Sequence, residues 1–266
     1  MKLLIVICVL LFPYLIFAEE KSIVVLITSY NNGRWVDKNV LSALQQDYTH
    51  YRVIYIDDES TDGTVRRVED LVRLHKNKNN FTLIRNAKRK GALANIHYAV
   101  HNLCENDAII VSLDGDDWFF DNQVLKKINA IYNENEIWIT HGTLIEYPSG
   151  STDWNLQIPP DIVSCNQFRS YRCPSHLRTF YSWLFKKIRL EDLLYEGEFF
   201  PMAWDQAIMF PMMEMAAERH CFIPNVLYVY NMANPLNDNK VDPALQRNLE
   251  AFIRAKLPYQ RLEDKN

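Results

Sequence analysis

The chain has 266 residues, of which 48% are hydrophobic and 12% are aromatic, and its formal net charge is −4. A chain of this length and apolar content can bury one large core or two modest ones, which excludes an intrinsically disordered protein. The densest basic cluster is the short run Lys88–Lys90. Without a longer basic block, the charge gives no case for nucleic acid as a partner.

The N-terminal segment is apolar from Leu3 to Phe17 except for Tyr14, and it ends at Ala18 before acidic residues. This pattern predicts that residues 1–18 are a secretory signal peptide or a short membrane anchor. A helix over this segment would be shorter than the ~30 Å hydrocarbon core of a bilayer, which favours the cleaved signal. A retained anchor would hold the folded domain against a membrane.

Strand-like and helix-like segments alternate in the first half of the chain. Runs of β-branched and apolar residues predict strands, and apolar residues at helical spacing predict amphipathic helices. The predicted strands cover residues 22–28, 51–56, 81–84, 108–113 and 137–147. The predicted helices include residues 35–46, 65–72, 92–103 and 124–131. This alternation predicts an α/β fold in which a mostly parallel sheet carries helices on both faces.

The pattern changes near Pro148. Residues 148–200 are rich in Pro, Ser, Asn and aromatic residues, and we expect them to form a specificity region that packs on the sheet. A helix at 204–217, a strand at 226–230 and an amphipathic helix that starts at Pro243 are predicted to follow. We therefore divide one domain into two halves, residues 21–147 and 148–266.

Four cysteines remain if the signal segment is removed, namely Cys104, Cys165, Cys173 and Cys221. An even number is consistent with export, and Cys165 and Cys173 are close enough in sequence to close a small loop. Four unpaired thiols explain the same residues equally well. None of the spacings is that of a zinc site.

Acidic residues follow two of the predicted strands. Asp114, Asp116 and Asp117 come directly after strand 108–113, and Asp57 follows strand 51–56. Because ligands of open α/β sheets bind at the carboxyl ends of strands, we expect these groups to share one site. Carboxylates suit Mg²⁺ or Mn²⁺, which proteins usually hold together with the oxygens of a bound phosphate. The sequence therefore predicts a divalent cation and a substrate that carries a pyrophosphate.

A calcium-loop motif overlaps one of these clusters. Its positions are matched by Asp58, Ser60, Asp62, Gly63, Val65 and Glu69. The motif needs an entering helix, whereas residues 52–56 are β-branched and aromatic. We therefore expect a strand end, followed by a helix that begins between Thr61 and Thr64 with hydroxyl and carboxylate caps.

The chain resembles a known family at these motifs. Residues 24–64 read VVLITSYNNGRWVDKNVLSALQQDYTHYRVIYIDDESTDGT, and residues 113–118 read LDGDDW. They are similar to the opening segment and to the metal-binding DxD motif of the family 2 glycosyltransferases, nucleotide-diphospho-sugar transferases with a GT-A (Rossmann-like) fold. The resemblance makes residues 21–147 the nucleotide-sugar-binding half. Residues 148–266 become the half that binds the acceptor and carries the catalytic base.

The resemblance implies roles for particular residues of the donor side. Thr28 and Tyr30 would line the pocket of the nucleotide base, and Asp57 would accept a hydrogen bond from the base edge. Asp114 would approach the ribose, and Asp116 would bind the metal, Mn²⁺ or Mg²⁺, that bridges the diphosphate. Asp117 is equally explained as a cap of the following turn.

Basic residues near the predicted third strand have a less specific role. Arg85, Lys90 and Gly91 match a region that passes near the nucleotide, where the Lys90 ammonium could touch the diphosphate. A solvated surface explains these residues as well as the nucleotide does.

The acceptor side offers one candidate base. Asp205, in the segment AWDQAIMF, matches the carboxylate that family members place at a helix N-terminus; the structural alternative is a plain helix cap. His176, Arg178, Tyr181 and Trp183 could receive an acceptor sugar or form a satellite core, and His141 is predicted to be a core histidine. After the predicted strand 226–230 no histidine is present to bind a metal, and Asn231, Asn237 and Asp238 are possible substitutes or turn residues.

We therefore expect a metal-dependent, inverting glycosyltransferase of hexosyltransferase type. Its donor would be a nucleotide sugar, with UDP-sugars favoured, and its acceptor a hydroxyl of a glycan, protein or lipid. The alternatives are a nucleotidyltransferase on a similar sheet and a secreted, calcium-stabilised, non-catalytic carbohydrate-binding protein. The N-terminal segment predicts the lumen of the secretory pathway or a membrane-associated location.

Overall fold

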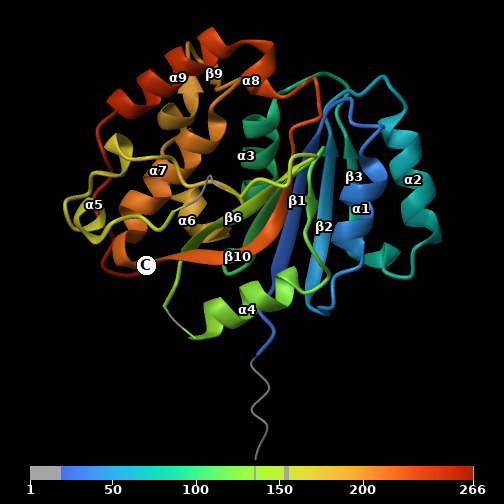
Figure 1. The fold of residues 1–266 in the computed structure, drawn as a ribbon, viewed down its shortest axis with the longest axis horizontal. Coiled ribbons are helices and arrows are strands. Elements are labelled where there is room, and N and C mark those ends of the chain that lie inside the picture. Colours follow the sequence, from blue (N-terminus) through green and yellow to red (C-terminus); the bar gives the residue numbers. More distant parts are fainter. Residues whose placement is uncertain (1–18, 135, 153–155, 266) are drawn as a thin grey trace, which may run out of the picture.

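A computed structural model of the protein describes residues 19–134, 136–152 and 156–265. The predicted signal or anchor segment, residues 1–18, lies outside the described residues. The described chain folds around one large twisted sheet with helices packed on both of its faces (Figure 1). The predicted α/β fold with a mostly parallel sheet is therefore confirmed.

The large sheet contains strands from both halves of the chain. In spatial order these are β3 (Phe81–Arg85), β2 (Tyr51–Asp57), β1 (Ile23–Ser29), β4 (Ile109–Asp114), β7 (Arg178–Tyr181), β6 (Ile139–Tyr147), β10 (His220–Asn231) and β5 (Trp118–Phe119). Strands β3, β2, β1 and β4 are parallel to one another, and β6 is parallel to β10. Strand β7 is antiparallel to both neighbours, and β5 is antiparallel to β10. A small second sheet pairs β8 (Leu194–Tyr195) with β9 (Glu198–Phe199).

Two hydrophobic cores lie on opposite faces of this sheet. Side chains alternate along a strand, so Val24 and Leu26 of β1 enter one core while Val25 and Ile27 enter the other. One core is covered by α1 (Val36–Leu44), α2 (Thr64–Leu74) and α4 (Val124–Glu134). The other core is covered by α3 (Ala92–Leu103), α6 (Ser182–Lys186), α7 (Trp204–Ala216) and α9 (Pro243–Ala255). Two further helices, α5 (Pro160–Ser164) and α8 (Asp238–Val241), are short.

The helix starts follow local chemistry. Helix α9 begins at Pro243, as predicted, after Asp242, whose Oδ1 accepts a hydrogen bond of 2.9 Å from the Leu245 amide. Helix α2 starts at Thr64, as predicted, after Gly63 in the left-handed region with φ +88°, and the predicted carboxylate cap is supplied by Asp62, whose Oδ1 accepts a hydrogen bond of 3.0 Å from the Thr64 amide. A residue without Cβ adopts that angle without strain. Because β2 and not a helix precedes this turn, the calcium-loop motif is not an EF-hand.

One predicted region differs from the structure. Residues 148–200 were expected to pack on the sheet, but their segment Arg178–Tyr181 forms β7 inside the sheet, between β4 and β6. Phe180 and Thr179 of this strand are fully buried. A strand of four residues is too short to show a period in the sequence, so only its long-range pairing reveals it.

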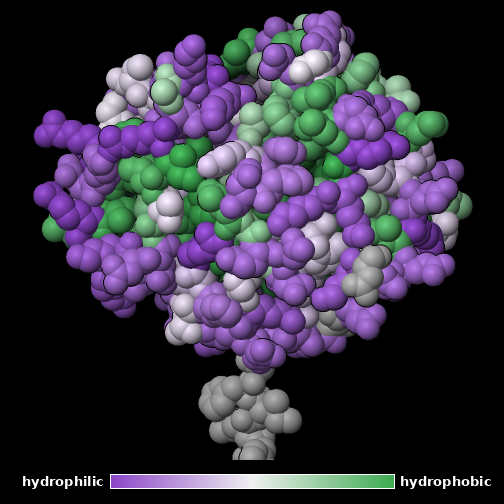
Figure 2. All heavy atoms as spheres, turned by 180° about the vertical axis from the view of Figure 1, so that it is seen from behind, coloured by the Kyte–Doolittle hydropathy of each residue, from purple (hydrophilic) through white to green (hydrophobic). Residues whose placement is uncertain are grey.

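The surface is mostly polar. Hydrophilic residues cover most of the face seen in Figure 2, and hydrophobic residues are visible between them. The large exposed hydrophobic residues belong to several separate elements, and they include Leu74, Phe120 and Phe252. In the described parts of the chain, no helix is both long and apolar enough to span a membrane. The four described cysteines, Cys104, Cys165, Cys173 and Cys221, carry free thiols.

Candidate functional site

The register of three parallel strands brings the predicted donor residues to one edge of the sheet. Thr28 of β1 is paired with Asp114 of β4, and Ser29 is paired with Asp57 of β2. Adjacent strands lie about 4.8 Å apart. The two acidic clusters therefore meet at the carboxyl ends of neighbouring strands, as the sequence predicted for a single site.

The turn after β4 is held from two sides. The Gly115 amide donates to the carbonyl oxygen of Thr28 at 3.0 Å, and a Cβ at Gly115 would lie 2.5 Å from the Cβ of Ser29. From α1, Asn39 Nδ2 donates to the carbonyl oxygens of Asp114 and Asp117 at 2.8 and 2.7 Å. Glycine is thus required by the close approach of β1, and Asn39 fixes the path of the acidic turn.

The aspartates of this turn have different surroundings. Asp117 is buried, and its carboxylate accepts hydrogen bonds from the Tyr228 hydroxyl at 2.6 Å and the Asn231 amide at 2.7 Å. Burial and the charges of Asp116 and Asp114 raise the pKa of Asp117 well above its ordinary value. Because both of its oxygens already have protein donors, Asp117 anchors the turn to β10.

Asp116 is held less tightly. Its Oδ2 accepts a hydrogen bond of 2.7 Å from Asn234 Nδ2, and its carbonyl oxygen accepts one of 3.1 Å from Asn231 Nδ2. Burial is the main cause that raises the pKa of Asp116 to about 6. The hydrogen bond from Asn234 lowers this pKa, and the charge of Asp114 raises it further. The loop after β10 therefore positions the carboxylate that was predicted to bind the metal.

Asp114 faces a cationic neighbourhood. Its Oδ2 lies 3.1 Å from His176 Nε2, and its amide donates to the Tyr228 hydroxyl at 3.2 Å. Burial raises the pKa of Asp114, but the His176 hydrogen bond and the charges of His176 and Arg178 outweigh it, so the net pKa is lowered. Among the three aspartates of the turn, Asp114 is therefore the one whose environment most favours the ionised form.

The donor set fits a hard divalent cation. Ligand atoms of Asp114, Asp117 and His176 lie within 4.8 Å of one another. However, Arg178 Nη1 is 2.9 Å from His176 Nε2, and a guanidinium at that distance repels a metal ion on the imidazole. This group of ligand atoms in the described part of the chain does not include Asp116, so the predicted metal role of Asp116 stays a prediction.

The residues of the predicted base pocket lie beside this cluster. Asp57 is 2% exposed; its Oδ2 accepts a hydrogen bond of 3.0 Å from the Ser60 amide, and its Oδ1 has no partner among the described residues. Thr28 and Tyr30 are half-buried, and the Arg89 guanidinium lies 3.8 Å from the centre of the Tyr30 ring. An unpaired buried carboxylate oxygen is costly unless a ligand donor satisfies it.

The loop that carries Lys90 is fixed through its backbone. The amides of Lys90 and Gly91 donate to Asp58 at 3.0 and 2.8 Å, while the Lys90 ammonium lies over the ring of Tyr98 at 5.8 Å. Arg85 forms an ion pair with Glu69. Among the described residues, neither cation contacts the aspartate cluster, so their predicted contact with a diphosphate stays a prediction.

Asp205 is connected to the donor side through β7. It is the second residue of α7, and its Oδ2 accepts a hydrogen bond of 2.8 Å from Arg178 Nη2. Arg178 Nη1 contacts His176 Nε2, which in turn contacts Asp114. The predicted base and the predicted ribose ligand therefore lie at the two ends of a row of four side chains in polar contact.

The sequence left some contributors to this site unidentified. It named His176 and Arg178 only as possible acceptor or core residues, and it did not single out Asn39 or Asn234. A possible signal for Asn234 was the asparagine-rich segment NMANPLNDN after the strand. Of the proposed substitutes, Asn231 contacts the acidic turn, whereas Asn237 donates to the Tyr230 hydroxyl at 2.6 Å. The predicted core histidine His141 is buried.

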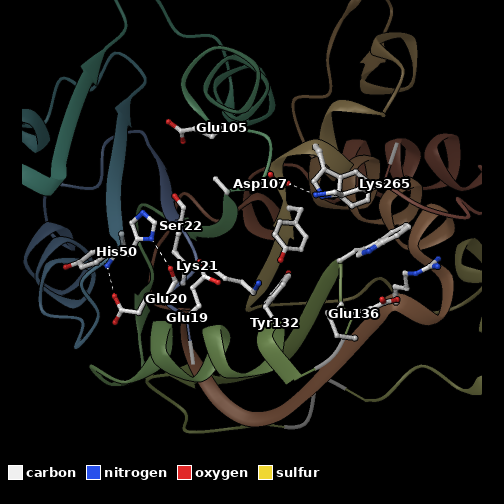
Figure 3. A pocket seen from close by; sticks show the side chains of 18 of the residues that line it. Glu19, Glu20, Lys21, Ser22, His50, Glu105, Asp107, Tyr132, Glu136 and Lys265 are labelled. Atoms are coloured by element: carbon white, nitrogen blue, oxygen red, sulfur yellow. Dashed lines mark hydrogen bonds and ion pairs between the residues drawn. The ribbon is translucent and has the colours of Figure 1, made fainter. Parts of the chain in front are cut away.

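A large cavity lies at the opposite edge of the sheet. It has a volume of about 1030 Å³, and its lining includes Glu19, Ser22, His50, Glu105 and Tyr132 (Figure 3). Ser22 precedes β1 and His50 precedes β2, so this cavity opens at the amino ends of the strands. The acidic clusters at the carboxyl ends of the strands are therefore separate from this cavity.

Comparisons with solved structures support the fold. Residues 1–349 of TarS from S. aureus match with a TM-score of 0.60 and 17% identity, over 79% of this chain and 60% of that one. The mannosyltransferase PcManGT from Pyrobaculum calidifontis, solved with GDP-Man and Mn²⁺, matches with a TM-score of 0.55 and 19% identity, over 83% and 59% of the two chains. The chain thus spans about 60% of the length of these structures, and they confirm the GT-A fold.

Sequence comparison assigns the family. No curated protein matches the chain. The model of glycosyl transferase family 2 matches residues 24–194, which is more than half of the chain and includes β1, the acidic turn and β7. The protein therefore belongs to glycosyl transferase family 2.

Proposed function

We propose that this protein transfers a sugar from a nucleoside diphosphate donor, with UDP-sugars as the favoured class, to the hydroxyl of a glycan, protein or lipid. One observation carries the proposal: Asp57, Asp114 and Asp116 gather at one sheet edge, and Asp205 is joined to Asp114 through two side chains. The matched TarS structures include complexes with UDP-GlcNAc and with UDP, which supports this donor class.

The donor would bind across the carboxyl ends of β2, β1 and β4. The unpaired Oδ1 of Asp57 would accept a hydrogen bond from the base, which Thr28 and Tyr30 would flank, and Asp114 would accept one from the ribose. Lys90 is proposed to approach the diphosphate. Asp116, with Asp114, would hold Mn²⁺ or Mg²⁺, which when bound stabilises the negative charge of the departing diphosphate.

Asp205 would act as the general base. Its side chain is 27% exposed, and at the first turn of α7 the helix dipole favours a negative charge. By taking the proton of the acceptor hydroxyl, it would allow the oxygen to attack the anomeric carbon from the face opposite the diphosphate. A single displacement of this kind inverts the configuration at that carbon.

The near-isosteric change Asp205→Asn tests the proposal. The assay follows release of the nucleoside diphosphate from UDP-, GDP- and dTDP-sugars, with Mn²⁺, Mg²⁺ or a chelator present. We expect metal-dependent release by the wild type from a preferred donor. In the variant, removal of a general base should reduce turnover by about 10²–10⁴-fold while donor binding is retained. Unchanged turnover in the variant would refute the assignment of the base.

A parallel assay, supplied with a nucleoside triphosphate and a sugar phosphate, separates the alternative functions. A nucleotidyltransferase would release pyrophosphate from a nucleoside triphosphate and a sugar phosphate. A non-catalytic, calcium-stabilised carbohydrate-binding protein would release neither product. That alternative has lost its main support, since strand β2 occupies the place of the entering helix of an EF-hand.

The location of the protein is part of the proposal. Nucleotide sugars are present in the cytosol and in the lumen of the eukaryotic secretory pathway. The apolar residues 3–17 favour the lumen, with membrane contact through this segment if it is retained. Microscopy of the full chain with a C-terminal tag would test this location, and a uniform cytosolic signal would contradict it.

A further inference from the structure

Arg178 is a buried cation with several polar contacts. Its side chain is 5% exposed, and its guanidinium contacts Asp205 Oδ2 at 2.8 Å, His176 Nε2 at 2.9 Å and the Pro174 carbonyl oxygen at 3.4 Å. A buried charge must be paired and hydrogen-bonded to be tolerated. The planar guanidinium reaches two side chains at once, which the single ammonium of a lysine cannot do in the same geometry.

His176, which the guanidinium contacts, is held in place by aromatic stacking. The His176 ring stacks on the Tyr228 ring with a centroid distance of 4.4 Å and an interplanar angle of 16°, and on the Tyr230 ring at 5.5 Å. Arg178 itself lies on β7, which β4 and β6 flank on both sides. The guanidinium therefore has little freedom to move.

We propose that Arg178 is a positioning residue for the transfer: it holds the carboxylate of Asp205 at a fixed place relative to the donor residue Asp114. This inference rests on the proposed function. Arg178 donates to one carboxylate oxygen, Oδ2, and within the described part of the chain Oδ1 accepts no hydrogen bond. The second oxygen is thereby left to face the acceptor hydroxyl in a defined orientation.

A second buried ion pair, between Arg169 and Glu214, differs from the pair of Arg178 and Asp205. Arg169 pairs with Glu214 through both carboxylate oxygens, at 2.6 and 2.9 Å, and Oε2 also accepts a hydrogen bond from the Tyr259 amide. Glu214 is fully buried. That pair leaves no accessible carboxylate, as expected for a purely structural ion pair. Arg169 therefore supplies a matched control for the loss of a buried arginine.

The test compares Arg178→Lys with Arg169→Lys in the full chain. The probe is the nucleotide sugar from which the wild type releases its diphosphate fastest, with water as the acceptor. For Arg178→Lys we expect kcat to fall by about 10²-fold, because a misplacement of about 1 Å at a reacting group has this effect. The KM for the donor should stay within about threefold, because donor contacts are kept. Arg169→Lys should lower Tm and leave kcat within about twofold of the wild type.

Chemical rescue provides a second readout. Arg178→Ala leaves space where the guanidinium lay, and millimolar guanidinium chloride should restore part of its kcat, whereas it should not raise the kcat of Arg169→Ala. If Arg178→Lys follows Arg169→Lys, with lowered Tm and unchanged kcat, the inference is overturned while the proposed function stands. A wild type that releases no nucleoside diphosphate from any donor overturns the proposed function, and this inference with it.

Discussion

The substitution Gly115→Ala tests how closely the acidic turn must approach β1. The new methyl carbon would lie 2.5 Å from the Cβ, 2.6 Å from the Oγ and 2.8 Å from the Cα of Ser29. Carbon atoms in contact are normally separated by about 3.5–4.0 Å, so the turn and the strand must move apart by about 1 Å or more. The contact includes a backbone atom of a central strand, which cannot rotate away as a flexible side chain could.

Two effects should follow from this displacement. Overpacking of a rigid contact costs about 1–3 kcal/mol of unfolding free energy. In a domain of this size that corresponds to a decrease in Tm of roughly 2–12 °C. The hydrogen bond from the Gly115 amide to the Thr28 carbonyl, 3.0 Å long, should be strained. Asp114 and Asp116 on either side should move with it and lose affinity for the metal and the nucleotide.

Thermal unfolding and calorimetric titration with UDP and Mn²⁺ measure these effects. The double variant Ser29→Gly/Gly115→Ala removes the Cβ and Oγ contacts, so it should recover part of the Tm and of the affinity relative to Gly115→Ala. Ser29→Gly alone, which loses the 3.2 Å hydrogen bond from Asn32 Nδ2, is the control. Wild-type Tm and nucleotide affinity in Gly115→Ala would refute the close approach of the turn to β1.

Other changes test the surroundings of the site. Asn39→Leu keeps the approximate side-chain volume but removes both hydrogen bonds that Asn39 donates to the acidic turn. Urea unfolding should show that the free energy of unfolding falls by about 2–4 kcal/mol. A loss under about 0.5 kcal/mol would count against these hydrogen bonds. If Asp116 binds Mn²⁺, the ion at a hundredfold its dissociation constant should stabilise the wild type by about 2.7 kcal/mol, whereas Asp116→Asn should show little stabilisation. Burial, followed by the His220 charge, lowers the pKa of His141 to about 4 in the folded protein. Between about pH 4 and 6.5, His141 therefore binds a proton in the unfolded chain but not in the folded one, and the free energy of unfolding falls as pH falls. From pH 7.5 to 5 this costs about 2 kcal/mol, and urea unfolding of His141→Phe should show a correspondingly smaller loss; an equal loss would show that His141 does not titrate on unfolding.

Local sequence patterns were sufficient to predict the strands and helices of the first half of the chain. The strands that end at Asp57 and Asp114 and the helix Ala92–Leu103 were predicted close to their observed bounds, because burial of apolar residues repeats with the period of each element. The same periodicity placed two acidic clusters at strand ends, and parallel strands put such ends on one edge. The edge of the sheet that carries the acidic residues could therefore be predicted without knowing any contact.

The contacts around those residues could not be predicted. Arg178 and Asp205 are 27 positions apart in the chain, and His176 and Asp114 are 62 apart. Their meeting depends on β7, a strand too short to be recognised from its own residues, which pairs between β4 and β6. Asn39 and Asn234 likewise reach the acidic turn from distant segments.

The sequence by itself determined the fold class, the family resemblance and the chemical type of the site, since these depend on local periodicity and residue chemistry. Only the tertiary structure decided which side chains surround each carboxylate. It paired Asp117 with Tyr228 and Asn231, Asp116 with Asn234, and Asp205 with Arg178. Burial and hydrogen bonding set the charge and orientation of each carboxylate, and both depend on residues brought together from far along the chain.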